Sequence, residues 1–456
     1  MKAQLIISAC LFTAGLSAQD LGHKAPPQAE AVVIENAALF PVTAAPIARG
    51  WIHFEDGVIR GLGEGDAPAV QGENVHRIDV DGAHVYPGMI SAVTTLGLVE
   101  ISAVRATDDI SETGDFTPEV RSAVAINPDS TVIPVTRSNG VLSAGVFPSG
   151  GLVPGRASVI SLDGWTWEDM AVSADAGLVV NWPASRSRGS WRSSRRGAEP
   201  PASDAVAKRR ASIDDLFADA RRYLDARAAD PTVPMDIRLE AMRPAITGET
   251  QVYVRANDLE QIESAVAWAD RQDLPIVIVG GRDAYMCSDL LVRSGVPVIL
   301  TGTHQLPSRR DSDYDAPFRT PALLEEAGVT WCLASTGNFY NERNLPYHAA
   351  TAVAFGLSKD AALRSVTLSP AEILGVGHRL GSLDVGKSAT LFVAHGDPLL
   401  IQTHIDMAFI HGRRIDLKNK QTELAEKYIQ KYRQLGIWPD GGLDPHAGHD
   451  HGHEGK

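Results

Sequence analysis

The sequence predicts an α/β fold, namely a (β/α)8 TIM-like barrel with a small β-sandwich domain built from both ends of the chain. Two observations predict it. Short, continuous apolar runs recur between about residues 87 and 383, and in the second half they alternate with helical stretches, which is typical of a parallel sheet covered by helices. Near both ends apolar and polar residues alternate, with Asp-Gly and Gly between the runs, which indicates short antiparallel strands.

The antiparallel strands are expected in residues 30–86 and 384–416, which together form a composite domain. The apolar residues of these strands recur at every second position, so each strand has one face for a core. The runs are AVVIENAALF (31–40), GWIHFEDGVIRGLGEG (50–65), SATLFVA (388–394) and MAFIHGR (407–413).

The barrel is expected in residues 87–383. A helix is predicted over 258–272, and two capped helices begin at Ser358 and Ser369, where Pro370 takes the first helical position and Glu372 completes a capping box. The apolar runs interpreted as barrel strands are VIPV (132–135), ASVISL (157–162), IVIVGG (276–281), VPVILTGT (296–303) and VTWCLAST (329–336).

Four segments lie outside these two units. Residues 1–18 have a lysine at position 2, an apolar run and small residues at the end, which predicts a cleaved signal peptide and export to the periplasm or the exterior. Residues 183–212 are basic and rich in Pro, Ser and Gly, which predicts a flexible insertion; the alternative is a contact for an anionic envelope polymer or lipid. A C-terminal helix is expected over 417–438 and a disordered tail over 439–456.

Composition excludes some partners. The formal net charge of -14 argues against nucleic acid, because phosphate binding needs a basic surface. No stretch after the signal peptide is long and apolar enough for a membrane span.

Cys287 and Cys332 could pair in an oxidising compartment, or could simply be small core residues. The tail offers weak binding of divalent metal ions at His446, His449, His451 and His453.

Two segments resemble the amidohydrolase superfamily, in particular its imidazolonepropionase-like branch. They are PGMISAVTTLGL (87–98) and the longer segment from Asn344 to Val393, and the resemblance covers roughly residues 30–416. It implies hydrolysis of non-peptide carbon–nitrogen bonds in cyclic amides or related small molecules. It also implies zinc or another divalent metal at the C-terminal mouth of the barrel, and homodimers are common among similar proteins.

The residues that would hold this metal are substituted. The family needs His-x-His on the first strand, because residues i and i+2 share one face, and the alignment places Val93 and Thr95 there. It places Arg255 and Gly280 at the next two histidines and Thr336 near the proton-accepting aspartate. Valine has no donor atom and arginine is permanently cationic. The resemblance therefore implies a barrel without its usual metal, and no cofactor is predicted.

A surviving site would be lined by the strand ends and the loops that follow them. His304 is an ionisable group just past a buried strand, although a loop histidine bonded to backbone is the alternative, and Arg282 could simply pair with Asp283. Trp165 and Trp167 suit stacking on a sugar or aromatic ligand, or are core residues on one strand face. The other candidates are Glu100, Arg105, Asp108, Asp109, Asn338, Asn341 and Arg343.

Two hypotheses follow from the sequence. In the first, the protein still hydrolyses a carbon–nitrogen bond with unfamiliar ligands or an unrecognised site, as the resemblance implies. In the second, it is a pseudoenzyme that binds a small molecule, a glycan or an envelope partner in the pocket at the barrel mouth. The substituted metal positions favour the second hypothesis.

Overall fold

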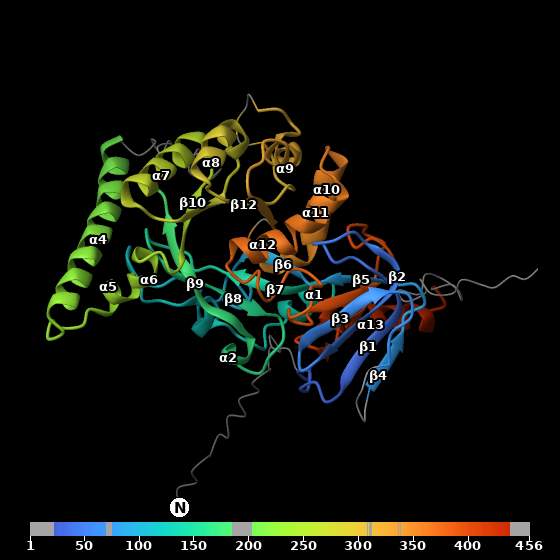
Figure 1. The fold of residues 1–456 in the computed structure, drawn as a ribbon. Coiled ribbons are helices and arrows are strands. Elements are labelled where there is room, and N and C mark those ends of the chain that lie inside the picture. The colour runs from blue at the N-terminus through green and yellow to red at the C-terminus, as the bar shows by residue number, and fades with distance from the viewer. Residues whose placement is uncertain are drawn as a thin grey trace, which may run out of the picture.

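The computed structural model describes residues 22–69, 75–184, 203–307, 309, 312–335, 337 and 339–437. The chain forms a composite sheet and, beside it, a barrel-like body of strands and helices (Figure 1). The segments at 1–18 and 439–456, with the four tail histidines, lie outside the described residues. Among the described helices, none is both long and apolar enough to cross a membrane.

The composite sheet joins the two ends of the chain. Strand β5 (His84–Pro87) pairs antiparallel with β14 (Leu391–Ala394), which links the early strands to the late ones. The sheet order is β16-β15-β14-β5-β1-β2-β3, and β4 also pairs with β1, so all eight strands belong to one branched sheet. The remaining strands are β1 (Ala31–Leu39), β2 (Ile47–Glu55), β3 (Val58–Glu64), β4 (Val75–Asp79), β15 (Ile405–Ile410) and β16 (Arg413–Ile415).

The second sheet has eight strands paired in chain order. The first and last strands contact each other without pairing in the described chain, so the sheet is nearly closed into a barrel. Its strands are β6 (Met89–Thr94), β7 (Val141–Val146), β8 (Gly155–Ser161), β9 (Ala171–Asn181), β10 (Gln251–Ala256), β11 (Ile276–Gly280), β12 (Val298–Thr301) and β13 (Trp331–Ala334).

One barrel strand runs against the others. The prediction of a regular (β/α)8 barrel is wrong for β8, which pairs antiparallel with both β7 and β9. Only residues 147–154 connect β7 to β8, and a parallel pairing needs a crossover of a dozen or more residues. From β9 to β13 every pairing is parallel, as predicted.

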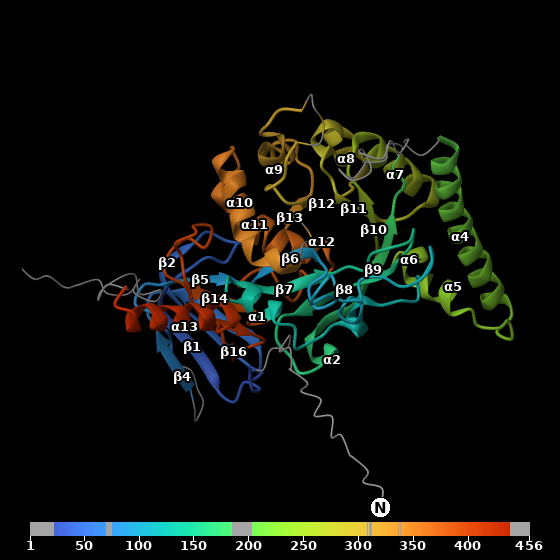
Figure 2. The ribbon, with the colours of Figure 1, turned by 180° about the vertical axis from the view of Figure 1, so that it is seen from behind.

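Helices cover mainly the β9–β13 half of the barrel (Figures 1 and 2). The last helix, α13 (Lys420–Gln434), lies beside the composite sheet instead (Figure 2). The helices of the barrel half are α4 (Ser203–Ala229), α5 (Ile237–Ala241), α6 (Arg243–Ile246), α7 (Leu259–Gln272), α8 (Ser288–Ser294), α9 (Ala316–Glu326), α10 (Leu345–Ala354), α11 (Lys359–Ser365) and α12 (Leu368–Ile373).

Some local predictions are confirmed and others are wrong. Ser358 caps α11 through its side chain, as predicted, and the helix predicted over 258–272 is α7, with Asp258 as its cap. Ser369 does not cap α12, because the helix begins at Leu368 with Thr367 at its cap position, two residues before Ser369. The VIPV run, predicted as a barrel strand, is helical and forms α1 (Val132–Arg137). Its residues are buried, and a helix makes its backbone hydrogen bonds internally, so the run needs no strand partner.

Part of the predicted insertion is also helical. Residues 203–212 form the start of α4, while 185–202 lie outside the described residues. Phe217 of this helix packs edge-on against Trp268 of α7. Arg210 also donates two hydrogen bonds to the carboxylate of Glu260, at 2.8 and 3.0 Å. Tertiary packing therefore overrides the polar composition of this segment.

The tryptophans at 165 and 167 are not on a strand. Trp165 is 64% exposed, and Trp167 begins the short helix α2 (Trp167–Met170). The prediction that both could share one strand face is therefore wrong.

The barrel separates two apolar cores. An inner cluster includes Tyr253, Val277, Ile299 and Cys332 from alternating strand positions, and α12 packs against it. An outer cluster lies between the strands and the surrounding helices. Cys332 and Cys287 are both buried and free, so they do not form a disulfide.

Candidate functional site

Arg255 lies on the inner face of the barrel. Residues alternate along β10, so that Val252, Val254 and Ala256 join the outer core while Tyr253 joins the inner one. Arg255 shares the face of Tyr253 and stands one residue before the C-terminal end of the strand. This places its guanidinium at the mouth of the barrel.

The guanidinium of Arg255 has a polar partner but no counter-charge. Its Nη1 donates to Oδ1 of Asn181, the residue opposite it on β9, at 3.2 Å. Asn181 is itself fixed, because its Nδ2 donates to the carbonyl oxygens of Gly150 and Gly151 at 2.7 and 2.9 Å. No carboxylate among the described residues forms an ion pair with Arg255.

Burial lowers the pKa of Arg255 to about 10, because the charged guanidinium loses hydration without gaining an anionic partner. The group still carries its proton at neutral pH. The barrel mouth therefore presents a positive charge where the resemblance implies a metal ligand.

The other positions that the resemblance assigns to metal ligands lie near the ends of β6 and β11, and they do not all share the face of Arg255. Val93 is buried in the inner cluster near the end of β6, and Thr95 follows that strand. Gly280 pairs with Ala256 and Leu300, which belong to the outer core, so a side chain there would not share the face of Arg255. Thr336 lies outside the described residues.

These residues do not fit a catalytic divalent metal. Such an ion needs several His, Cys, Asp or Glu side chains converging on one point. Across the part of the chain that the structure describes, no three of them come together in this way. The buried positive charge of Arg255 would also repel a cation.

Glu342 is a buried carboxyl that the sequence interpretation overlooked, although its neighbours Asn341 and Arg343 were candidates. It lies in the turn η4 (Phe339–Asn344), at the seam between β6 and β13. It accepts hydrogen bonds from the hydroxyls of Ser91 at 2.5 Å and Ser335 at 2.7 Å. Burial nevertheless raises the pKa of Glu342 to about 7.

His304 turns toward α10 and contacts a second histidine. Its Nε2 lies 2.8 Å from the Thr351 hydroxyl, and its ring centroid lies 4.1 Å from that of His348. His348 accepts at Nδ1 from the backbone of Thr303 at 3.1 Å. Burial, with a smaller contribution from His304, lowers the pKa of His348 to about 3. The two histidines are therefore neutral, and their contacts stabilise the loop that follows β12.

Arg282 and Asp283 do not pair with each other. Asp283 accepts from Arg309 at 2.6 Å and from the backbone of Leu259 at 3.2 Å, so it links two loops. Arg282 reaches Gln305 at 3.4 Å, while its Nη1 is buried without a hydrogen-bond partner in the described part of the chain.

The remaining candidates do not join Arg255. Glu100 accepts from the backbone of Thr131 at 3.3 Å, and burial raises its pKa. Arg343 donates to Gln421 of α13, on the side of the composite sheet. Arg105 donates to the Asp108 carbonyl within its own loop. Asp109 and Asn341 form no hydrogen bond through their side chains with other described residues, and Asn338 lies outside the described residues.

Known proteins resemble this chain in sequence and in fold. Residues 312–415 match the model of the amidohydrolase family. The chain is also 26% identical over 351 residues to amidohydrolase tasK of Hapsidospora irregularis, a match that covers 70% of this chain. It spans about a third of the length of that relative, because the match covers 35% of it.

Solved structures share the barrel. An amidohydrolase from Thermotoga maritima MSB8 superposes with a TM-score of 0.73 at 24% identity, covering 84% of this chain and 99% of the other. A Xaa-Pro dipeptidase with bound methionine in its active site gives 0.52 at 14% identity, covering 85% and 100%. An adenosine deaminase from Xanthomonas campestris with bound zinc gives 0.50 at 16% identity, covering 90% and 100%. The mixed α/β fold is therefore that of amidohydrolase barrels.

Proposed function

We propose that this protein is an exported, ligand-binding member of the imidazolonepropionase-like branch, and that it does not use metal-activated water. Its ligand is a small molecule with a carboxylate, which Arg255 binds at the barrel mouth. The observation that carries the proposal is the charge of Arg255, which has no anionic partner among the described residues.

The chemistry of the guanidinium supports this ligand class. A planar guanidinium binds a carboxylate through two parallel hydrogen bonds, and one nitrogen of Arg255 is held by Asn181 while the others are available. A buried charge without a partner costs free energy, which a bound carboxylate would offset. The structurally similar Xaa-Pro dipeptidase holds methionine, which also supports an amino-acid-like ligand for this chain.

Calorimetric titration with L-methionine, L-proline and N-acetyl-L-proline tests the proposal. At least one probe should bind the full chain, and its amide, which lacks the carboxylate, should bind about tenfold or more weakly, as loss of a charged hydrogen bond predicts. Arg255→Gln should weaken binding by a similar factor. Arg271→Gln, on the surface of α7, is the matched control. Equal binding of acid and amide would contradict the ligand class.

Metal content separates the proposal from the alternative of a metal-dependent hydrolase. The chain without residues 444–456, which removes the tail histidines, should contain far less than one zinc ion per molecule by elemental analysis. Zinc at one ion per chain in this shortened protein would instead support carbon–nitrogen bond hydrolysis by the family mechanism.

A further inference from the structure

A cavity of about 460 Å³ lies where the composite sheet meets the barrel. We propose that it is a second ligand site, for a small organic anion held between Arg379 and Arg413. This site is separate from the barrel mouth, and the proposal does not depend on the function assigned to Arg255.

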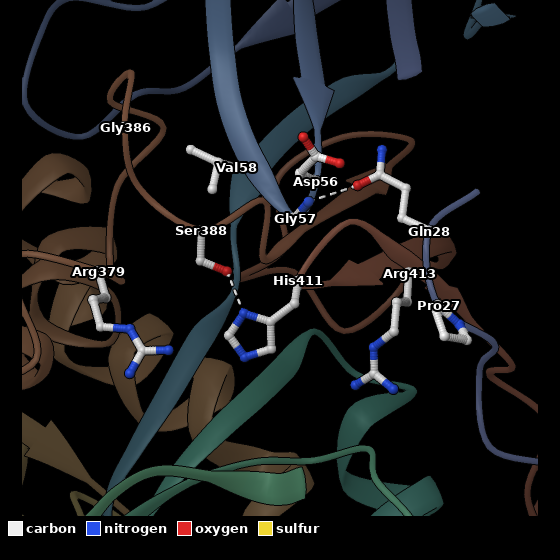
Figure 3. Close-up of a pocket in the computed structure, with 10 residues that line it drawn as sticks. All are labelled: Pro27, Gln28, Asp56, Gly57, Val58, Arg379, Gly386, Ser388, His411 and Arg413. Atoms are coloured by element: carbon white, nitrogen blue, oxygen red, sulfur yellow. Dashed lines mark hydrogen bonds between the residues drawn. The ribbon is translucent and has the colours of Figure 1, made fainter. Parts of the chain in front are cut away.

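The cavity is built from segments that are distant in the sequence (Figure 3). The N-terminal segment contributes Gln28, and the turn between β2 and β3 contributes Gly57. Arg379 and Ser388 come from the segment between α12 and β14, and Arg413 begins β16. The volume lies within the range of small-molecule sites, about 300–1,000 Å³, and so exceeds what an inorganic ion needs.

The charges around the cavity are unbalanced. Arg413 pairs with Asp163 at 3.2 Å, but Arg137 uses the same carboxylate at 2.9 Å. Arg379 is an exposed residue at the rim of the cavity; it donates to the Val172 carbonyl at 2.9 Å, and no described carboxylate forms an ion pair with it. The carboxylate of Asp56 also lines the cavity, but it is 79% exposed and pairs with Arg60. Two guanidinium groups therefore face the cavity with too little negative charge, which favours an anion.

His411 lies between the two arginines and is kept neutral (Figure 3). Burial, and then the charges of Arg379 and Arg413, lower its pKa to about 4. Its Nδ1 lies 2.8 Å from the hydroxyl of Ser388 and its Nε2 lies 3.0 Å from that of Ser161. The histidine thus adds no positive charge, and it fixes the Ser388 hydroxyl in the wall of the cavity.

The backbone at His411 supports a role for this side chain. His411 has φ of 51° and Gly412 has φ of 71°, in the tight turn between β15 and β16. Asn, Asp or Gly are the residues favoured in such a turn, and a larger residue with positive φ is strained. The two hydroxyl contacts offset this strain and hold the ring between the arginines.

Citrate is a suitable probe, because it is an organic anion that fits this volume. We expect saturable citrate binding by calorimetry at constant ionic strength, and weakening of about tenfold or more in Arg379→Gln. Arg379→Lys should recover part of the affinity. The matched control is Arg364→Gln, because Arg364 is a surface residue of α11 paired with Glu372. Loss of citrate binding in Arg255→Gln but not in Arg379→Gln would place the anion at the barrel mouth and overturn the proposal.

A second measurement needs no variant. Phenylglyoxal modifies accessible arginines, and peptide mass spectrometry gives the rate at each position. Citrate should protect Arg379 of the full chain and leave the rate at Arg364 unchanged. Equal rates at Arg379 with and without citrate would overturn the proposal, as would the absence of saturable citrate binding.

Discussion

Two charge centres of this protein differ in whether the arginine has an acidic partner. Where the sheet meets the barrel, Asp163 accepts ion pairs from Arg137 and Arg413, and all three side chains are largely buried. At the barrel mouth, Arg255 has an amide partner and no described carboxylate. At the first centre two guanidinium groups share one carboxylate, and this shared contact joins the barrel to the composite sheet. The second leaves a charge that a ligand can complete.

The largest expected effect is at Asp163, the carboxylate that Arg137 and Arg413 share. Asp163→Asn should lower the free energy of unfolding by about 3–5 kcal/mol, because it leaves two buried guanidinium groups without their shared partner. Urea denaturation followed by tryptophan fluorescence measures this change. Glu372→Gln, which removes an exposed ion pair with Arg364, should cost at most about 1 kcal/mol. Equal losses in the two variants would show that the centre is not structural.

The next effect concerns the carboxyl at the barrel seam. The pKa of Glu342 is raised to about 7, above its unfolded value near 4.5, so the folded state binds the proton more tightly. Stability should therefore fall as pH rises between these values, by roughly 2–3 kcal/mol, and then level off.

Glu342→Gln removes this titration. The stability of the variant relative to the natural chain should rise by a similar amount between about pH 5 and about pH 8 in urea denaturation. Arg271→Gln, on the surface of α7, leaves this carboxyl unchanged and provides the reference profile. Parallel pH profiles of the Glu342 variant and the natural chain would contradict the prediction.

The smallest effect has the opposite sign. Arg255→Met should raise the free energy of unfolding by about 1 kcal/mol in the absence of ligand, because it replaces an uncompensated charge with an apolar side chain. Arg271→Met on the surface of α7 should change stability by less than about 0.5 kcal/mol. Thermal and urea denaturation compare the two. A loss of stability in Arg255→Met would mean that the arginine serves the fold, as Asp163 does.

The two halves of the barrel differ in how well the sequence pattern predicted their strands. From β9 to β13, apolar strands alternate with capped helices such as α7, so the order and direction of the strands could be predicted. Between β6 and β9 the short connection at 147–154 forces an antiparallel pairing, and its Gly150 and Gly151 were the signal for it. The buried VIPV run is equally apolar as a helix or a strand, so its pattern did not decide between them.

The candidate site was predicted less completely than the fold. Alternation along β10 placed Arg255 inside the barrel, whereas its assignment to a metal-ligand position rests on the resemblance and stays a prediction. Glu342 could not be recognised in the same way, because its partners Ser91 and Ser335 lie on two other segments of the chain. The partner of Asp283 is likewise Arg309, and not the adjacent Arg282.

By itself, the sequence determined the alternation of strands and helices from β9 to β13 and the pairing of strands from the two chain ends. These depend on local periodicity, on caps and on residue chemistry. Only the tertiary structure decided which charges are paired, since Asp163 meets Arg413 across 250 residues and Arg379 does not meet a described carboxylate. The exposure of each side chain is also a property of the folded chain: Arg255 is half-buried, so its unpaired charge is costly, whereas Arg379 is exposed to water.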